Sequence, residues 1–272
     1  MTAPICVDGS EVQARDGPIR EAAERSLNTD RCSIISARPR TGPCAIMIPA
    51  PMLPWRDIDT VLLDMDGTLL DLRYDTTFWQ AYLPARYAAH HDVSENDART
   101  LVQGMMTEAR SRLDFYCFDW WSAATDLDIA AMKPDLAHLI RYRHGAEAFI
   151  AEIRASGRRT VIVTNAHPVG IDLKHCITGV ADLVDRLECA HDHEYPKEHS
   201  AFWDRVQTRI GFDPARTLLV DDNLEVLACA EQFGIRHLRA ILRPDSSQPC
   251  LTDLPYPAVD DLTEMLAGFH DG

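Results

Sequence analysis

The chain has 272 residues, 46% of them hydrophobic and 25% charged, and its formal net charge is −15. This length and composition predict a globular protein with a real core. The negative charge disfavours nucleic acids and anionic membrane surfaces as partners. No apolar run approaches the roughly 20 residues that a membrane-spanning helix needs. A small anionic substrate remains possible if a metal and a few local cations oppose the net charge.

The first segment, residues 1–54, shows no sustained periodicity and ends in a cluster of prolines. We interpret it as a disordered extension, or as sequence upstream of a true start at Met47 or Met52. The eight cysteines are scattered without a C-x-x-C pair. This pattern favours reduced thiols over a disulfide framework or a zinc site, and with them a cytoplasmic location.

The next segments alternate between strand and helix. Apolar runs predict strands at 58–64, 160–164, 217–220 and 235–238, with a weaker one near 183–187. Most of these strands are followed by a helical pattern, which is typical of a parallel sheet covered on both faces. Residues 75–143 break the alternation, because they are aromatic and helical throughout. We therefore predict an α/β fold with a doubly wound parallel sheet and an inserted all-helical domain.

Polar residues follow the ends of several predicted strands, or lie just beyond them. In a doubly wound sheet such ends converge on one crevice. Each has an ordinary alternative, because Asp or Thr-Asn at a strand end often caps the next helix and a lone lysine is usually solvated. Their joint order is more specific than any one of them. The residues are Asp64 and Asp66, Thr164 and Asn165, Lys197, and Asp221 and Asp222.

This order resembles the haloacid dehalogenase-like (HAD) hydrolase superfamily, whose pattern is DxDGT, then Thr or Ser, then Lys, then an acidic pair. The resemblance implies a core formed by residues 55–71 and 144–272, and a mobile helical cap at 72–143 that closes over the site. It further implies that Asp64 attacks phosphorus to give an aspartyl-phosphate. Asp66 would protonate the leaving oxygen and then accept a proton from water. A second acid beside the nucleophile favours phosphoryl chemistry over halide release.

The resemblance also implies the groups that bind metal and phosphate. Mg²⁺ would lie between Asp64, the main-chain carbonyl of Asp66, and Asp222, and Asp221 would be a further ligand or lie just behind. The transferring phosphoryl group would be held by Thr164, Asn165, Lys197 and nearby N–H groups. Only three lysines occur in the chain, so the lysine at position 197 fits a role for a compact point charge.

Longer segments resemble the bacterial GMP/IMP 5′-nucleotidase family: DTVLLDMDGTLLDL, FWQ, YCFDWWS, VTNAHP and EYPKE. This implies a purine nucleoside monophosphate as substrate. Aromatic residues of the cap would stack on the base, although Trp79, Trp120 and Trp121 are more simply explained as the cap's own core. At least one of Tyr74, Tyr116 and Arg73 would face the crevice. His167 either touches the substrate or, as we favour, caps the helix at Pro168 or packs against it. His191 and His193 are predicted to be exposed loop residues.

Other functions remain open from the sequence. The same chemistry suits a phosphatase for a sugar phosphate or phosphoglycolate and, more weakly, a phosphomutase. A non-catalytic binding module of the same fold is the alternative from a different class. It would not need Asp64, Asp66, Lys197 and Asp222 together. The oligomeric state is not indicated.

Overall fold

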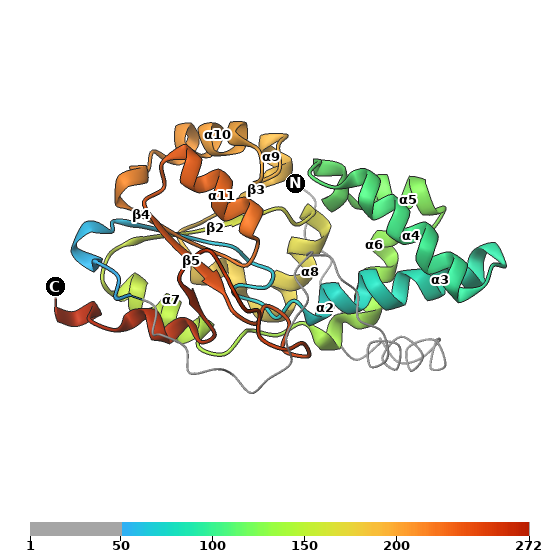
Figure 1. The fold of residues 1–272 in the computed structure, drawn as a ribbon, viewed down its shortest axis with the longest axis horizontal. Coiled ribbons are helices and arrows are strands. Elements are labelled where there is room, and N and C mark those ends of the chain that lie inside the picture. The colour runs from blue at the N-terminus through green and yellow to red at the C-terminus, as the bar shows by residue number, and fades with distance from the viewer. Residues whose placement is uncertain (1–50, 272) are drawn as a thin grey trace.

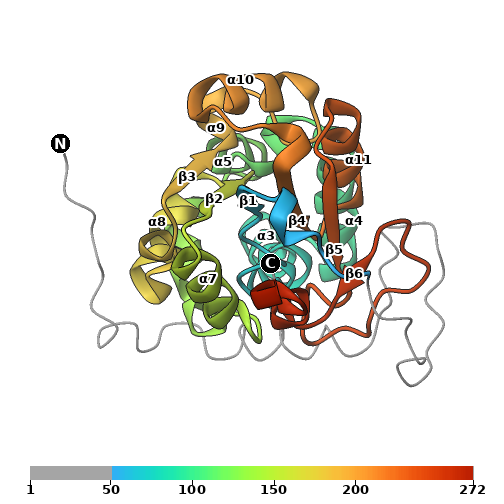
Figure 2. The ribbon, with the colours of Figure 1, turned by 90° about the vertical axis from the view of Figure 1, so that its left-hand side faces the viewer.

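A parallel sheet organises the protein, whose computed structural model describes residues 51–271. Its six strands lie in the order β3-β2-β1-β4-β5-β6. The chain starts in the middle with β1 and adds β2 and β3 on one side, then β4, β5 and β6 on the other (Figure 2). The strands are β1 (Thr60–Leu63), β2 (Arg159–Thr164), β3 (Arg186–Cys189), β4 (Thr217–Asp221), β5 (His237–Ile241) and β6 (Ala258–Val259).

Helices cover both faces of the sheet and also form a separate lobe. The helices of the sheet domain are α7 (Ala146–Ala155), α8 (Pro168–Thr178), α9 (Ala190–His193), α10 (Ser200–Ile210) and α11 (Leu224–Phe233). The helices of the lobe are α2 (Arg73–Thr77), α3 (Leu83–His91), α4 (Glu95–Ala109), α5 (Phe118–Thr125) and α6 (Ile129–Met132). The lobe also contains the 3-10 helix η4 (Lys133–Leu139), and the sheet domain contains the 3-10 helix η7 (Leu262–Leu266).

The buried side chains of the strands alternate between two cores. Val61 and Leu63 of β1 belong to one core together with α7, whereas Leu62 belongs to the other together with α10 and α11. This alternation follows from the period of two residues in a strand. Figure 2 shows α7 and α8 on one side of the sheet and α10 and α11 on the opposite side. The predicted doubly wound fold is therefore confirmed.

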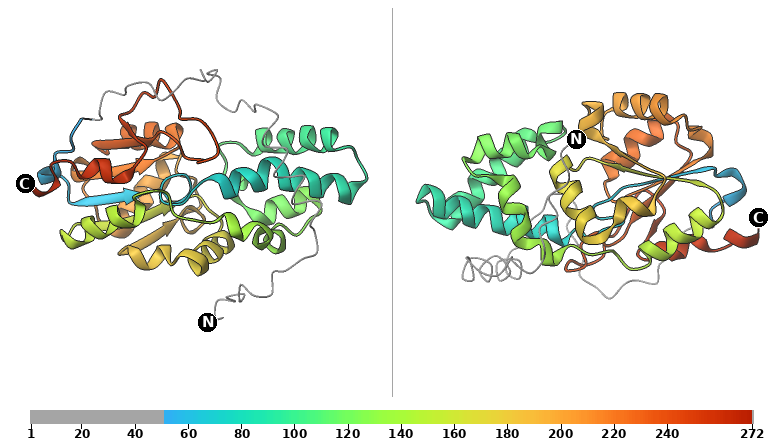
Figure 3. Two further views of the ribbon diagram at one scale, coloured as in Figure 1. Left: turned by 90° about the horizontal axis from the view of Figure 1, so that it is seen from below. Right: turned by 180° about the vertical axis from the view of Figure 1, so that it is seen from behind.

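The helical lobe, called the cap below, comprises residues 73–139 and lies at one end of the sheet (Figures 1 and 3). It has its own core, in which Trp121 is 1% exposed and Trp79 and Trp120 pack at the edge. All three tryptophans thus pack in the cap's core, and Trp79 and Trp121 also line the cavity of the candidate site. Ser94 caps α4 by accepting a hydrogen bond from the N–H of Asp97, at 3.1 Å.

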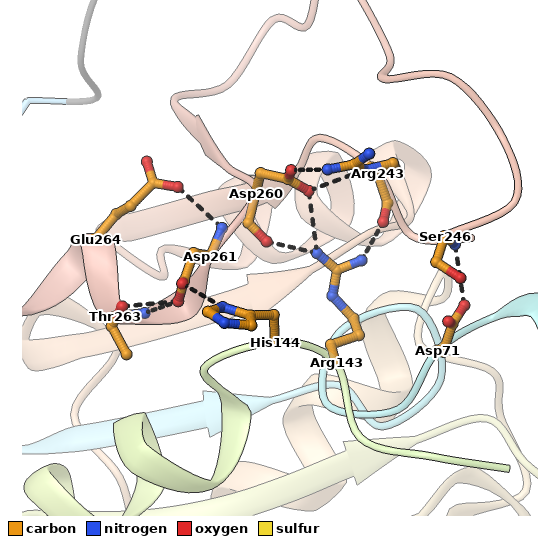
Figure 4. A network of polar contacts seen from close by, with 9 residues as sticks. All are labelled: Asp71, Arg143, His144, Arg243, Ser246, Asp260, Asp261, Thr263 and Glu264. Carbon is orange, nitrogen blue, oxygen red and sulfur yellow. Dashed lines mark hydrogen bonds and ion pairs between the residues drawn. The ribbon is translucent and has the colours of Figure 1, made fainter.

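Two linkers join the cap to the sheet domain, and they lie side by side. Leu70 pairs with Tyr142 in an antiparallel bridge, and the N–H of Asp71 donates to the carbonyl of Arg141 at 3.0 Å. The C-terminal segment fastens both linkers (Figure 4). The N–H of Ser246 donates to Asp71 Oδ1 at 3.0 Å, and Arg143 donates to the carbonyl of Asp260 at 2.7 Å.

Some sequence-based expectations fall elsewhere. The predicted disorder of residues 1–54 lies almost entirely outside the described residues. The strand predicted near 183–187 is β3, which begins slightly later, and β6 was not predicted because it has only two residues. Cys117, Cys189 and Cys229 form no disulfide bond, as expected, whereas Cys176 is disulfide-bonded. Among the described residues, no helix is both long and apolar enough to cross a membrane.

Candidate active site

The ends of β1, β2 and β4 place the predicted site residues together. Leu63 pairs with Val220 in register, and Asp64, the next residue, donates its N–H to the carbonyl of Val220 at 2.9 Å. Thr164 ends β2 and Asp221 ends β4. Asp64, Thr164 and Asp221 are all buried. The convergence predicted for strand ends of a doubly wound sheet is therefore present at this edge.

Lys197 joins two of the acids. Its Nζ lies 2.5 Å from Asp64 Oδ1 and 2.7 Å from Asp221 Oδ2, and the side chain is 3% exposed. Burial opposes its positive charge, but Asp221 and Asp64 outweigh burial and raise the pKa of Lys197. The ammonium is therefore charged beside the predicted nucleophile.

Asn165 orients the segment that carries Lys197. Its Oδ1 accepts from the N–H of Lys197 at 2.9 Å, and its Nδ2 donates to Glu198 Oε2 at 2.9 Å. The side chain of Asn165 is thus engaged with protein groups. In our prediction, the main-chain N–H of Asn165 is the group that would contact a phosphate. Thr164 Oγ1 accepts from the N–H of Ala166 at 3.1 Å and lines the cavity described below.

Three carboxylates form a group that suits a divalent cation. Oxygen atoms of Asp64, Asp221 and Asp222 all lie within 4.8 Å of one another. Burial raises the pKa of Asp64 to about 7. The charge of Lys197 opposes this rise, and the charge of Asp221 adds to it. Burial and the charges of Asp64 and Asp221 raise the pKa of Asp222 well above its usual value. A bound cation would relieve this repulsion.

The surroundings of Asp222 support the same interpretation. Asp221 is held by Lys197 and by the N–H of Asn223, at 2.9 Å. Within residues 51–271, by contrast, no hydrogen bond or ion pair engages the Asp222 carboxylate. That carboxylate lies against Gly67, where an added Cβ would approach Asp222 Oδ2 to 2.5 Å. The oxygen-only set of potential ligands would suit a hard divalent cation such as Mg²⁺.

A second lysine, which sequence reasoning missed, contacts the other predicted catalytic acid. Lys174 Nζ, from α8, lies 2.7 Å from Asp66 Oδ1 and 2.7 Å from Asp75 Oδ2. Asp75 belongs to α2 of the cap, and its Oδ1 accepts from Lys133 Nζ at 3.0 Å. Lys133 lies in turn among aromatic rings, 4.1 Å from the centroid of Phe78 and 4.7 Å from that of Trp79.

Asp66, Lys174, Asp75 and Lys133 form a charged row, in which burial and neighbouring charges shift each pKa differently. Burial raises the pKa of Asp66 to about 6, with Lys174 opposing the rise. Burial alone would also raise the pKa of Asp75, but Lys174 and Lys133 outweigh it and lower that pKa to about 2. Burial lowers the pKa of Lys133 to about 8. Asp75 is thus the carboxylate most firmly held in its charged form.

The site opens into a cavity of about 290 Å³ between the sheet domain and the cap. The acids and all three lysines of the chain line it. The scarcity of lysine was the signal that would have identified Lys133 and Lys174. Aromatic side chains line it as well: Tyr74, Trp79, Phe115, Tyr116, Phe118 and Trp121.

At least one of the three residues proposed from the cap faces the crevice, as expected. Tyr74 and Tyr116 line the cavity, whereas Arg73 is not among its lining residues. His167 caps α8 as predicted, since its Nδ1 accepts from the N–H of Val169 at 3.3 Å. The prediction that His191 and His193 are exposed loop residues is wrong.

Both histidines lie in the short helix α9, and His191 is half-buried. His193 is 3% exposed, and its Nε2 lies 2.7 Å from Glu188 Oε2. The buried carboxylate of Glu188, in β3, needs such a partner, which explains why His193 turns inward.

Comparison with known proteins agrees with this geometry. The profile of the haloacid dehalogenase-like hydrolases matches residues 58–234. A GMP/IMP nucleotidase of Escherichia coli strain K12 is 35% identical over 214 residues, which cover 79% of this chain and 96% of that protein.

Solved structures share the fold at low sequence identity. A HAD phosphatase from Thermococcus onnurineus has a TM-score of 0.63 at 18% identity, covering 78% of this chain and 98% of that one. An L-2-haloacid dehalogenase from Xanthobacter autotrophicus has a TM-score of 0.54 at 15% identity, covering 79% and 99%. Because both identities are low, these likenesses concern the fold alone.

Proposed function

The chain belongs to the haloacid dehalogenase-like hydrolases, and we propose that it is a Mg²⁺-dependent phosphatase that hydrolyses purine nucleoside 5′-monophosphates such as GMP and IMP. One observation carries the proposal. Two acids, Asp64 and Asp66, stand at one strand end, and each contacts a different buried lysine. This arrangement gives the two acids separate environments and therefore separate roles.

The first role is nucleophilic attack. Asp64 forms a bond from a carboxylate oxygen to phosphorus while the bond from phosphorus to the leaving oxygen breaks, giving an aspartyl-phosphate. Lys197 stabilises the charge that builds on the phosphoryl oxygens, together with Thr164 and the N–H of Asn165. Asp64, the carbonyl of Asp66 and Asp222 would hold Mg²⁺, which would supply further positive charge there.

The second role is proton transfer. Asp66 gives its proton to the leaving oxygen, so that the nucleoside departs as a neutral alcohol. It then accepts a proton from the water that hydrolyses the aspartyl-phosphate, which returns both acids to their starting states. Some structural relatives release halide instead, as the Xanthobacter enzyme's name states. A second carboxylate placed for proton transfer favours an oxygen leaving group.

Two observations support a purine nucleotide as substrate. The similar Escherichia coli protein is a GMP/IMP nucleotidase. The cavity is lined by aromatic side chains, Tyr74, Trp79 and Phe118 among them, as well as by the acids and lysines. Stacking of a base on an aromatic side chain contributes about 1–3 kcal/mol where it has been measured in single-strand binders. This stacking would favour a nucleotide over a sugar phosphate of the same charge.

A substrate panel tests the proposal by phosphate release with Mg²⁺ present. It contains GMP, IMP, AMP, a hexose phosphate, phosphoglycolate and p-nitrophenyl phosphate, with Asp64→Asn protein as the control for contaminating phosphatase. We expect the highest kcat/KM for GMP and IMP. Equal or better hydrolysis of the sugar phosphate or phosphoglycolate would refute the purine assignment. Release of no phosphate from any compound would refute the enzymatic one.

A further inference from the structure

We propose that Lys174 is a positioning residue that aims the Asp66 carboxylate at the leaving oxygen, and that Asp75 ties this contact to the cap. The inference deepens the proposed function and rests on it, because it assigns the leaving-group side of the same site. Lys174 and Asp75 do not belong to the motifs that identified the site in the sequence. Neither position was predicted to have a role.

The contacts around Lys174 are short and enclosed. Its side chain is 4% exposed, and its ammonium bridges Asp66 and Asp75 at 2.7 Å each. The ring centroid of Tyr74 lies 5.3 Å from the same nitrogen. A buried ammonium held this way has few other partners, so it restricts the rotation of the Asp66 side chain. A carboxylate that must deliver a proton gains from such restriction.

Packing alone does not account for a charged residue here. Replacing buried ion pairs with apolar side chains is often neutral or stabilising, so a structural need is met more simply without charge. Lysine is also scarce in this protein. The site nevertheless uses two of its three lysines to contact the two acids separately, Lys197 for Asp64 and Lys174 for Asp66.

Asp75 links this arrangement to the cap. It lies in the first turn of α2, whereas Lys174 and Asp66 belong to the sheet domain. Lys133, also in the cap, contacts the opposite oxygen of Asp75. Movement of the cap away from the sheet domain would therefore draw Asp75 from Lys174. The hold on Asp66 is complete only when the cap lies over the site.

The role of Lys174 concerns one step. As the bond from phosphorus to the leaving oxygen breaks, the Asp66 proton moves to that oxygen, and Asp66 is left as a carboxylate beside the Lys174 ammonium. The phosphoryl group is transferred to Asp64 in the same step. A strongly basic leaving oxygen, such as the 5′-oxygen of a nucleoside, needs this proton. The weakly basic p-nitrophenolate departs without it.

The difference between leaving groups provides the test. We expect Lys174→Met to lower kcat/KM for GMP about 10²-fold or more, the range of lost acid–base help, while kcat/KM for p-nitrophenyl phosphate changes only a few-fold. The comparison uses kcat/KM because it reports formation of the aspartyl-phosphate and not its later hydrolysis, in which Asp66 acts for both substrates. Asp66→Asn should show the same pattern. The double variant should lose little more than Asp66→Asn alone, because Lys174 acts through Asp66. Lys174→Arg should recover part of the GMP activity.

Lys133→Met is the matched control, because it removes a buried lysine that contacts Asp75 but not Asp66. Its ratio of kcat/KM for GMP to kcat/KM for p-nitrophenyl phosphate should change less than that of Lys174→Met, because Asp66 keeps its own contact with Lys174. Equal losses on both substrates in Lys174→Met, or additive losses in the double variant, would show a merely structural role and overturn the proposal. Wild-type activity toward both substrates in Lys174→Met would overturn it too.

Failure of the substrate assignment would look different. If the wild type prefers another alkyl phosphate to GMP, the purine proposal fails and the leaving-group comparison is made with that compound. A crystal structure of Lys174→Met, or of Lys174→Gln if the first does not fold, gives a readout independent of activity. We expect the Asp66 side chain to leave the position it holds here. An unmoved Asp66 would contradict the positioning role.

Discussion

Gly67 and Asp222 occupy adjoining space so closely that a Cβ on Gly67 would lie 2.5 Å from Asp222 Oδ2. Gly67 also has a φ of +90°, which disfavours any residue with a side chain. The glycine of the DxDGT motif is thus required twice, once for the turn after β1 and once for the position of a candidate metal ligand.

Gly67→Ala should therefore raise the Mg²⁺ concentration needed for half-maximal activity by at least tenfold, because the Asp222 carboxylate must move. It should also lower the free energy of unfolding by about 1–2 kcal/mol through the strained backbone. Gly157→Ala is the control, since Gly157 has a φ of +78° and nothing within 4 Å of an added Cβ. It should lose similar stability but keep its Mg²⁺ requirement. A Gly67→Ala enzyme with an unchanged Mg²⁺ requirement would remove Asp222 from the metal site.

Asp64→Asn should abolish phosphate release, because an amide does not attack phosphorus, while the fold is kept. The amide oxygen still accepts a hydrogen bond from Lys197, whose Nζ lies 2.5 Å from the present carboxylate. Phosphate release and thermal unfolding of the same preparation provide the measurement. Substantial residual activity in a homogeneous preparation would exclude Asp64 as nucleophile.

Asp222→Asn and Asp221→Asn should differ in how their activity responds to added Mg²⁺. The first removes charge from a carboxylate that we assign to the cation, so we expect a 10- to 100-fold higher Mg²⁺ requirement with recovery at high Mg²⁺. The second breaks the 2.7 Å contact with Lys197, so added Mg²⁺ should restore little activity. Titration of each enzyme with Mg²⁺ after treatment with a chelator distinguishes them. Identical titration curves would contradict the assignment.

Lys133 predicts a pH dependence of stability. Burial lowers its pKa from 10.5 to about 8, so between these values the unfolded chain binds more protons than the folded one. Stability contributed by this group therefore rises with pH across that window, by on the order of 2 kcal/mol from pH 7 to pH 10. Lys133→Met should lack this rise.

Urea unfolding of the wild type and of Lys133→Met at pH 7 and pH 10 measures this difference. The stability of the wild type relative to the variant should increase at the higher pH. A difference that stays constant or reverses its sign would show that Lys133 is not buried in the charged row between α8 and the cap.

The sheet and four motif positions were predictable because they depend on local patterns. An apolar run that ends in Asp64, or in Asp221, identifies both a strand and its end, and the topology of parallel strands brings such ends together. Lys174 and Asp75 were missed because their meeting depends on how the cap lies against α8. No period within either helix encodes that arrangement. His193 was misjudged for a related reason, since only the fold shows that Glu188 is buried beside it.

The linkers show a similar limit. The start of the cap follows from the end of the strand pattern, but the contacts of Asp71 and Arg143 with residues 243–260 join segments that are far apart in the chain. The sequence of residues 243–260 gave no sign of this role. Contacts from this segment hold the two linkers of the cap (Figure 4).

The distribution of lysine also has a practical consequence. The side chains of Lys133, Lys174 and Lys197 are only 2%, 4% and 3% exposed, and the sequence contains no others. Reagents that acylate amines will therefore find almost no side-chain target on the folded surface. Any slow labelling beyond the α-amino group requires a buried lysine to become exposed for a time. Its rate would report how often the two lobes separate, without a mutation or an attached dye.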